Sequence, residues 1–246
     1  MPGAPQDSAS AGGLDGMADG VGGGPDLIIF DCDGVLIDSE PISLARLTDN
    51  LVRIGVPIDL ATVARRFTGT SMTSIMAHIA ADYGVATPEG FVDAVRADTL
   101  RAFEAELRAI AGVAEVLADL PQRRCVASSS DPARLRHALT LTGLLPLFGD
   151  HVFSSTMVAR GKPFPDLFLY AADRMGAEPG ACVVVEDSVP GVTAARGAGM
   201  RVLGFAGGGH WQHDRAGADL LAAGAALVFD DFRRLPALLG TLAEAA

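Results

Sequence analysis

The sequence predicts an α/β protein, a doubly wound parallel sheet with a small α-helical cap domain inserted into it. Short apolar runs that alternate with amphipathic helical stretches indicate the sheet. Between about residues 41 and 110 the strand pattern stops and only helical patterns remain, which indicates the insert. A chain of 246 residues, 49% of them hydrophobic and 20% charged, is long enough to bury one substantial core.

The apolar runs locate the strands. Strands are expected near 27–31, 124–128, 151–154, 182–186, 201–205 and 226–229. The helices between them have recognisable ends: Asp131-Pro132 begins one that Gly143 ends, Pro165 begins one that Gly176 ends, and Gly199 ends one that follows Ser188. In such a sheet the ligand crevice lies outside the carboxyl ends of the strands, so polar residues there are candidate site residues.

Helical signals dominate the predicted insert. Ile42 to Ile54 is amphipathic, Asp59 can cap a helix that runs to Thr68, and Thr87-Pro88-Glu89 opens a long helix to about Ile110. We expect four or five helices on two hinges, near Leu36–Pro41 and Ala109–Gly112. This gives a core domain of residues 26–40 and 111–246 and a cap of residues 41–110. A cap of this kind is expected to close over the crevice and exclude water.

Composition limits the possible partners. The net charge of −11 argues against nucleic acid, which needs a basic surface. No apolar run approaches about 18 residues, so no membrane span is expected. Residues 1–25 are rich in Gly, Ala, Asp and Ser and lack both a basic start and an apolar core, so they are predicted to be a disordered tail and not a secretory signal.

Three cysteines, Cys32, Cys125 and Cys182, fall within or beside the expected strands. Small apolar side chains are typical there, so we interpret the three as reduced core residues of a cytoplasmic protein.

The first expected strand leads directly into Asp31-Cys32-Asp33-Gly34. If the strand direction persists, Asp31 and Asp33 point to one side and Cys32 points away. Two convergent carboxylates suit a nucleophile paired with an acid/base, or a site for a hard cation. An acidic turn at Asp33-Gly34 is the alternative interpretation.

Lys162 is the only lysine in the chain, and it lies in the proline-fixed segment Gly161 to Asp166. A preference for Arg explains the scarcity, but a compact ammonium is also a good partner for phosphate. Two further strands end in polar residues, in Ser128-Ser129-Ser130 and in Glu186-Asp187-Ser188. Each of these segments can equally mark the start of the helix that follows it.

Taken in this order, the four segments resemble the haloacid dehalogenase-like hydrolase superfamily, in particular the subfamily with a helical cap after the first motif. The resemblance covers about residues 26 to 240 and is nearest to the sugar-phosphate phosphatases and β-phosphoglucomutases. It implies that Asp31 attacks phosphorus to form an aspartyl-phosphate, while Asp33 serves as acid and then base. Ser128 and the Ser129 amide would hold phosphoryl oxygens, and Lys162 would stabilise the transferring group.

Electrostatics adds a cofactor to this expectation. Each carboxylate near a phosphate dianion costs roughly 4 kcal/mol per charge pair at about 4 Å and an effective dielectric constant of about 20. Lys162 alone cannot offset this, and an oxygen-only donor set favours Mg²⁺ over Zn²⁺. By resemblance the ligands would be the Asp31 side chain, the Asp33 carbonyl, the Asp187 side chain, and Glu186 directly or through water.

The expected partner is a small phosphorylated substrate. The loop from Thr68 to Met72 is expected to face the site, and its hydroxyls suit a sugar or polyol, although a simple helix–helix turn is the alternative. Gly34, Gly69, Thr70 and Ser71 are therefore predicted to bind substrate together with Ser128, Ser129 and Lys162. Arg65 and Arg66 could meet a distal carboxylate or form a solvated helix face. His210 could reach the substrate or the cap, or be incidental to a flexible connector.

Residues that the family's other branches need are missing. Dehalogenases lack the second aspartate, present here as Asp33, and phosphonatases use a cap lysine, which this insert lacks. β-Phosphoglucomutases have His where this chain has Ser43 and Arg where it has Met72. The resemblance therefore implies a phosphatase for a sugar, sugar acid or sugar alcohol phosphate, working as a monomer or homodimer. A β-phosphoglucomutase-like mutase and a non-catalytic phosphate-binding regulator remain the alternatives.

Overall fold

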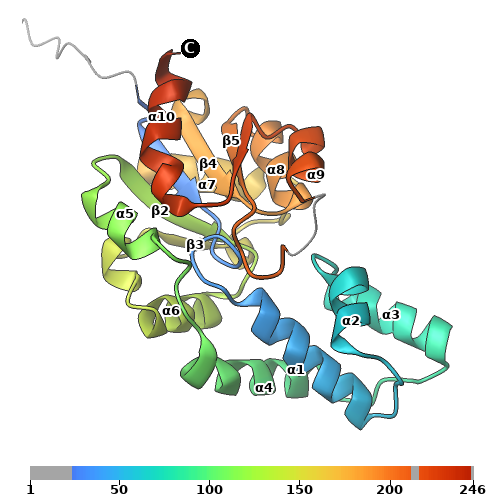
Figure 1. The fold of residues 1–246 in the computed structure, drawn as a ribbon. Helices are drawn as coiled ribbons and strands as arrows, with labels where there is room; N and C mark the ends of the chain where they lie inside the picture. The colour runs from blue at the N-terminus through green and yellow to red at the C-terminus, as the bar shows by residue number, and fades with distance from the viewer. Residues whose placement is uncertain (1–23, 212–215, 245–246) are drawn as a thin grey trace, which may run out of the picture.

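The computed structural model describes residues 24–211 and 216–244, so nearly all of the predicted tail, residues 1–25, lies outside the described residues. Six parallel strands form one sheet in the order β3-β2-β1-β4-β5-β6 (Figure 1). The strands are β1 (Leu27–Phe30), β2 (Arg123–Ser128), β3 (Val152–Ser154), β4 (Cys182–Glu186), β5 (Arg201–Phe205) and β6 (Leu227–Phe229). The predicted doubly wound sheet is confirmed, and its strand order reverses between β1 and β4.

Helices cover both faces of this sheet, and four more form the insert. The insert contains α1 (Glu40–Arg53), α2 (Leu60–Phe67), α3 (Met72–Tyr83) and α4 (Phe91–Glu106). The core contains α5 (Val113–Asp119), α6 (Pro132–Leu141), α7 (Asp166–Met175), α8 (Val189–Gly197), α9 (Ala216–Ala223) and α10 (Leu235–Glu244). Short 3₁₀ turns occur at Leu145–Leu147, Ser155–Met157, Pro179–Ala181 and Phe232–Arg234.

Alternating residues of β1 supply the two halves of the core. Ile28 and Phe30 face a cluster that α5, α6 and α10 complete, whereas Leu27 and Ile29 face a cluster that α7, α8 and α9 complete. Both faces of the strand are buried, as is usual for a parallel sheet covered by helices on both sides. The site at the end of β1 therefore follows a strand that is packed on both faces.

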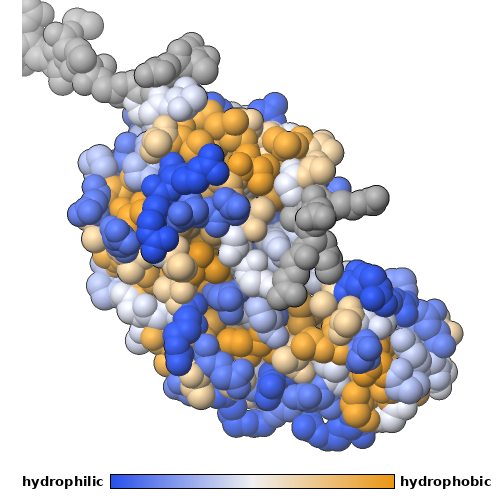
Figure 2. Space-filling model, in the orientation of Figure 1, coloured by the Kyte–Doolittle hydropathy of each residue, from blue (hydrophilic) through white to orange (hydrophobic). Residues whose placement is uncertain are grey.

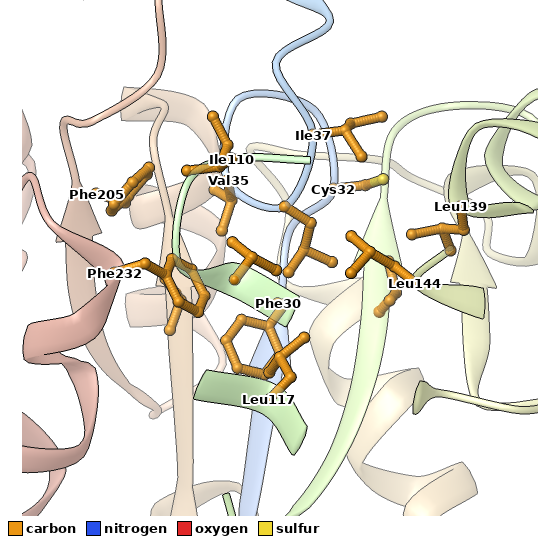
Figure 3. Close-up of a cluster of buried hydrophobic side chains, with 14 of the residues drawn as sticks. Phe30, Cys32, Val35, Ile37, Ile110, Leu117, Leu139, Leu144, Phe205 and Phe232 are labelled. Carbon is orange, nitrogen blue, oxygen red and sulfur yellow. The ribbon is translucent and has the colours of Figure 1, made fainter. Parts of the chain in front are cut away.

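β1 ends one residue earlier than predicted, at Phe30, and the chain then turns, with Gly34 at φ +79°. Cys32 is fully buried among apolar residues of the first cluster, where Figure 3 shows its thiol. It therefore points away from the two carboxylates, although the strand does not continue past it. Cys32, Cys125 and Cys182 are all free and buried.

The insert has a hydrophobic cluster of its own, formed by buried residues between Leu44 and Val95. In Figure 1 it projects from the core on two neighbouring connections. These connections pair with each other, because Asp38 N donates to Arg108 O at 3.0 Å and Ile110 N donates to Leu36 O at 2.9 Å. The insert therefore leaves and re-enters the core at one place.

Helix α4 is shorter than predicted at both ends. Gly90, at φ +75°, is its N-cap in place of the expected start at Thr87-Pro88-Glu89. The helix ends at Glu106 because Leu107 turns extended and is buried in the core cluster, as is Ile110. Burial of these two side chains outweighs the helical pattern that continues through the sequence.

Apolar and polar residues are mixed on the face of the molecule that Figure 2 shows. Figure 2 shows hydrophilic residues over much of the insert, with hydrophobic residues between them. Exposed large apolar side chains occur on the insert, such as Val52 and Leu60, and on the core, such as Phe164 and Leu221. Within the described ranges, no helix is long and apolar enough to cross a membrane.

Candidate active site

The four motif segments meet in one cleft of about 710 Å³ between the carboxyl edge of the sheet and the insert. Asp31 follows β1, Ser128 ends β2, and Glu186 ends β4, so three adjacent strands present these side chains at the same edge. The cleft is lined by Asp31, Asp33, Glu40, Thr68, Gly69, Thr70, Ser71, Met72, Ser128, Ser129, Ser130, Arg134, Lys162, Glu186, Asp187, Ser188, Val189, Pro190, His210 and Trp211.

Lys162 joins the first and last motifs. Its ammonium donates to Asp31 Oδ1 at 2.6 Å and to Glu186 Oε1 at 3.0 Å, and its side chain is 6% exposed. Burial opposes its charge, but the two carboxylates outweigh burial and raise the pKa of Lys162. Burial raises the pKa of Asp31 to about 7, against the lowering effect of Lys162. Asp31 therefore lies buried beside a cation and lines the cleft, which suits a nucleophile.

Asp33 is held on both oxygens. Arg134 on α6 donates to Oδ1 at 2.9 Å and to Oδ2 at 3.1 Å, while Ser39 and Ser130 donate to these oxygens at 2.6 and 2.7 Å. Burial alone would raise the pKa of Asp33, but the Arg134 charge and the hydroxyl donors outweigh it and hold the pKa below its usual range. Asp33 is a fixed carboxylate in this arrangement.

The three serines at the end of β2, Ser128, Ser129 and Ser130, make different contacts. Ser128 is 1% exposed, and its hydroxyl accepts from the Ser130 amide at 3.1 Å. Ser129 lines the cleft, and its carbonyl accepts from the Ser155 hydroxyl at 3.0 Å. Ser130 contacts Asp33, a contact that the sequence did not indicate. The predicted phosphate-binding roles of Ser128 and Ser129 stay predictions.

Glu186 accepts hydrogen bonds from its neighbours on both carboxylate oxygens. Oε1 accepts from Lys162 and from the Ser188 hydroxyl at 3.0 Å each, and Oε2 accepts from the Asp187 amide at 2.6 Å and the Ser188 amide at 3.2 Å. Helix α8 passes so close that a Cβ on Gly191 would lie 1.4 Å from Glu186 Oε1. Only glycine fits at that position without displacing the carboxylate.

Asp31, Glu186 and Asp187 form a buried group whose carboxylate oxygens lie within 4.8 Å of one another. Burial, and then the charges of Glu186 and Asp31, raise the pKa of Asp187 well above its ordinary value. Lys162 is the one cation that contacts this group among the described residues, which leaves a surplus of negative charge. A hard divalent cation such as Mg²⁺ fits this oxygen-only set.

His210 lies against this acidic group. Its Nε2 is 3.2 Å from Asp187 Oδ2, and its side chain is 2% exposed. Burial lowers the pKa of His210 to about 4, so the neutral ring lies beside the carboxylate. A Cβ on Gly34 would lie 2.0 Å from Asp187 Oδ2 and 2.8 Å from His210 Cε1. Gly34 thus lets these side chains approach the chain. It does not line the cleft, so its substrate-binding role stays a prediction.

The insert lines the cleft through Glu40, which lies near Asp33 and Arg134, and through the loop of residues 68–72. Gly69, Thr70 and Ser71 line it as the predicted facing loop requires, whereas Arg65 and Arg66 do not. Arg65 donates to Thr62, and Arg66 pairs with Asp82. Both arginines belong to the outer surface of the insert.

Sequence reasoning missed Arg134 and Glu40. Arg134 lies two residues after the expected helix start at Pro132, and only the folded chain brings it to Asp33, 101 residues earlier in sequence. Glu40 is the first residue of α1, where an acidic residue is usual in any helix. The available signal for a role of Glu40 in the site was its short distance in sequence from the motif Asp31 to Gly34.

Comparison with known proteins extends the resemblance. Residues 25–199 match the family model of the haloacid dehalogenase-like hydrolases. The chain is 32% identical to 6-phosphogluconate phosphatase of Escherichia coli (strain K12), over 74% of this chain and 83% of that protein. It is 31% identical to fructose-1-phosphate phosphatase of the same organism, over 70% and 92%.

A solved structure agrees with the fold. The HAD family hydrolase of Deinococcus radiodurans R1, with bound phosphate and sodium, has a TM-score of 0.76 and 34% identity over 91% of this chain and 97% of that chain. The family match covers more than half of the chain, and the strand order and the four motif segments agree with it. The chain belongs to the haloacid dehalogenase-like hydrolases.

Proposed function

We propose that this protein is a Mg²⁺-dependent phosphatase that hydrolyses a small phosphorylated sugar, sugar acid or sugar alcohol through an aspartyl-phosphate. The observation that carries the proposal is the meeting of all four motif segments in one cleft, with Asp31 paired to Lys162 at 2.6 Å. The phosphosugar phosphatases among the relatives support the substrate class.

Asp31 attacks phosphorus, and the bond from phosphorus to the leaving oxygen breaks. Asp33 first takes up a proton from solvent, which loss of the Arg134 contact favours because that contact lowers its pKa, and it gives this proton to the leaving alkoxide. The resulting carboxylate then takes a proton from the water that hydrolyses the aspartyl-phosphate. To reach the leaving group, Asp33 releases at least one of the donors that hold it, among them Arg134 and Ser130. Ser128, the Ser129 amide and Lys162 hold the transferring phosphoryl oxygens.

Mg²⁺ would be held by the carboxylates of Asp31 and Asp187 and by the Asp33 carbonyl. Glu186 would act on it through water, because both Glu186 oxygens already accept hydrogen bonds. The ion supplies positive charge to a site with surplus negative charge. Residues 41–110 serve as a cap domain that closes over the cleft and excludes water.

The first experiment assays the purified protein with Mg²⁺ on sugar, sugar acid and sugar alcohol phosphates, phosphoglycolate and glucose 1-phosphates. Free phosphate and phosphosugar isomers are both measured. We expect phosphate release that ends when the metal is chelated. Asp31→Asn should lower turnover by at least about 10³-fold, while the exposed substitution Asp49→Asn should leave it unchanged.

An intermediate gives a second readout. Acid-quenched protein should carry the phosphoryl label of a labelled substrate on an acyl phosphate that base releases, and Asp31→Asn should carry none. Isomerisation of a phosphosugar without phosphate release would contradict the phosphatase proposal and indicate a mutase. Binding without either reaction would replace it by a phosphate-binding regulator.

A further inference from the structure

Asp187 differs from the other two carboxylates of the acidic group in how its side chain is held. Asp31 is paired with Lys162, and Glu186 accepts hydrogen bonds on both oxygens. The Asp187 carboxylate has one polar side chain of the described residues against it other than acids, the imidazole of His210, whose Nε2 lies 3.2 Å from Oδ2. The orientation of this carboxylate therefore depends on where the imidazole lies.

The imidazole of His210 has a closely fitted place. Its side chain is only 2% exposed. A Cβ on Gly34 would lie 2.8 Å from His210 Cε1, and a Cβ on Gly208 would lie 2.9 Å from both Cε1 and Nδ1. The ring of Trp211 packs on the imidazole, with 4.8 Å between the ring centroids. Two glycines thus leave the space that the imidazole fills, and packing limits the positions it can take.

The loop that carries His210 is tied to the root of the insert. Gly209 N donates to Asp38 Oδ1 at 2.9 Å. Asp38 lies on the first of the two paired connections, where its own amide donates to Arg108 O at 3.0 Å. The residue directly before His210 is therefore fixed by a contact with a different part of the fold, and the imidazole is placed from both sides of the cleft.

A neutral imidazole in this place can orient a carboxylate that binds a metal. With its proton on Nε2 the ring presents a donor to Asp187 Oδ2, which leaves the other oxygen for an ion. Mg²⁺ requires a nearly ideal octahedral set of ligands, whereas Ca²⁺ accepts flexible sets in which a carboxylate binds through both oxygens. A carboxylate that is held at one oxygen therefore suits Mg²⁺ better than Ca²⁺.

From this arrangement we infer that His210 is a positioning residue for the metal: it orients the Asp187 carboxylate so that a single oxygen is offered to Mg²⁺. His210 lies outside the four motif segments and beyond residues 25–199, which match the family model. The inference rests on the proposed Mg²⁺ site and adds to it a residue of the loop after β5.

The test measures metal binding without substrate, by calorimetric titration of the protein with Mg²⁺ and with Ca²⁺. His210→Leu should raise the Kd for Mg²⁺ by at least about tenfold, as loss of a partner of a metal ligand does elsewhere. The Kd for Ca²⁺ should change by less than about threefold, because a freed carboxylate can bind the larger ion through both oxygens. His210→Gln, whose amide can donate from nearly the same place as Nε2, should restore most of the Mg²⁺ affinity.

Asp38→Ala tests the same contact without altering the imidazole. It removes the acceptor of the Gly209 amide and should raise the Kd for Mg²⁺ by at least about threefold. This variant decides the question if His210→Leu does not fold, which thermal unfolding in chelator shows. His151→Leu is the matched control, because His151 is an exposed histidine outside the cleft, and both Kd values should stay unchanged in it.

The outcomes separate the inference from the proposed function. An unchanged Kd for Mg²⁺ in His210→Leu, an equal rise for both ions, or no recovery in His210→Gln overturns the inference and leaves the phosphatase proposal intact. An equal rise for both ions would mean that the substitution loosens the site as a whole. Absence of Mg²⁺ binding in the unchanged protein would overturn the proposed metal dependence, and the inference with it.

Discussion

At the scale of single residues, the site contrasts two kinds of buried carboxylate. Glu186 has four hydrogen-bond donors and Asp33 has donors on both oxygens, so their charges are compensated by the protein. Among the described residues, His210 is the one basic side chain that contacts the Asp187 carboxylate, and burial and neighbouring acids raise the pKa of Asp187. The ionised form of Asp187 therefore opposes folding in the metal-free protein.

Asp187→Asn should therefore stabilise the metal-free protein. It should also remove the increase in stability that Mg²⁺ is expected to give. At a pH high enough to ionise Asp187 we expect a gain of roughly 1–3 kcal/mol in the free energy of unfolding, since a neutral amide then replaces a buried, poorly compensated charge. Thermal unfolding in chelator and in Mg²⁺ measures both effects. Asp150→Asn, whose side chain is 96% exposed, should change neither. Loss of stability without metal would contradict this reading of Asp187.

The sequence predicted the acidic and serine members of the site because each directly follows an apolar strand. It could not predict their partners, since the Arg134–Asp33 pair forms only when α6 is placed beside the turn after β1. The same limit applied to Glu40, whose local pattern is that of any helix start. Whether a carboxylate is anchored or unpartnered depends on long-range contacts.

At the scale of elements, helix α8 holds the end of β4 in place through its first turn. The Ser188 hydroxyl accepts from the Gly191 amide at 3.1 Å and donates to Glu186. Gly191 is buried against the same carboxylate, with no space for a side chain. The start of the helix and the acidic motif thus form one packed unit.

Gly191→Ala should displace Glu186 and with it Lys162. We expect a loss of about 1–3 kcal/mol in stability, as for other overpacked sites, and a larger proportional loss of phosphate release. Gly197→Ala is the control in the same helix, because its Cβ would meet Pro165 only at ordinary contact distances of 3.7 Å or more. Urea unfolding and phosphate release measure both variants. Equal losses of stability and of phosphate release in the two variants would contradict the close contact between Gly191 and the Glu186 carboxylate.

Strands were predicted to within a residue or two because burial on both faces leaves an uninterrupted apolar run, as in Cys182–Glu186. Helix ends in the insert were predicted less well. At Leu107 and Ile110 the pattern of α4 continues in sequence, but these side chains enter the core, and tertiary burial decides where the helix ends.

At the scale of the whole molecule, the acidic site links stability to pH. Without metal, the pKa values of Asp31 and Glu40 are raised to about 7, and that of Asp187 is raised well above its ordinary value. In the unfolded chain these acids titrate near pH 4. Between these limits the folded chain binds more protons than the unfolded chain, so stability falls as pH rises.

Lowering the pH from 8.5 to 6.5 in chelator should therefore raise the melting temperature by several degrees. Saturating Mg²⁺ should reduce this dependence, since Asp31 and Asp187 would then be ionised at both values. The range stops at 6.5 because His210, whose pKa is lowered to about 4, acts in the opposite sense below that pH. A melting temperature that is flat or rises with pH in chelator would contradict the expectation.

The paired connections between core and insert have an evolutionary consequence. Leu36 and Ile110 are joined by a backbone hydrogen bond, so the two points of insertion are neighbours in space. A recombination event that exchanged the intervening segment would leave the sheet and its acidic edge in place. Phe103 and Leu107 lie at the end of the inserted segment and pack in the core cluster. Such an exchange would therefore have to retain these two residues. A new substrate specificity can thus arise by exchange of the helical insert, while the acidic residues at the edge of the sheet stay unchanged.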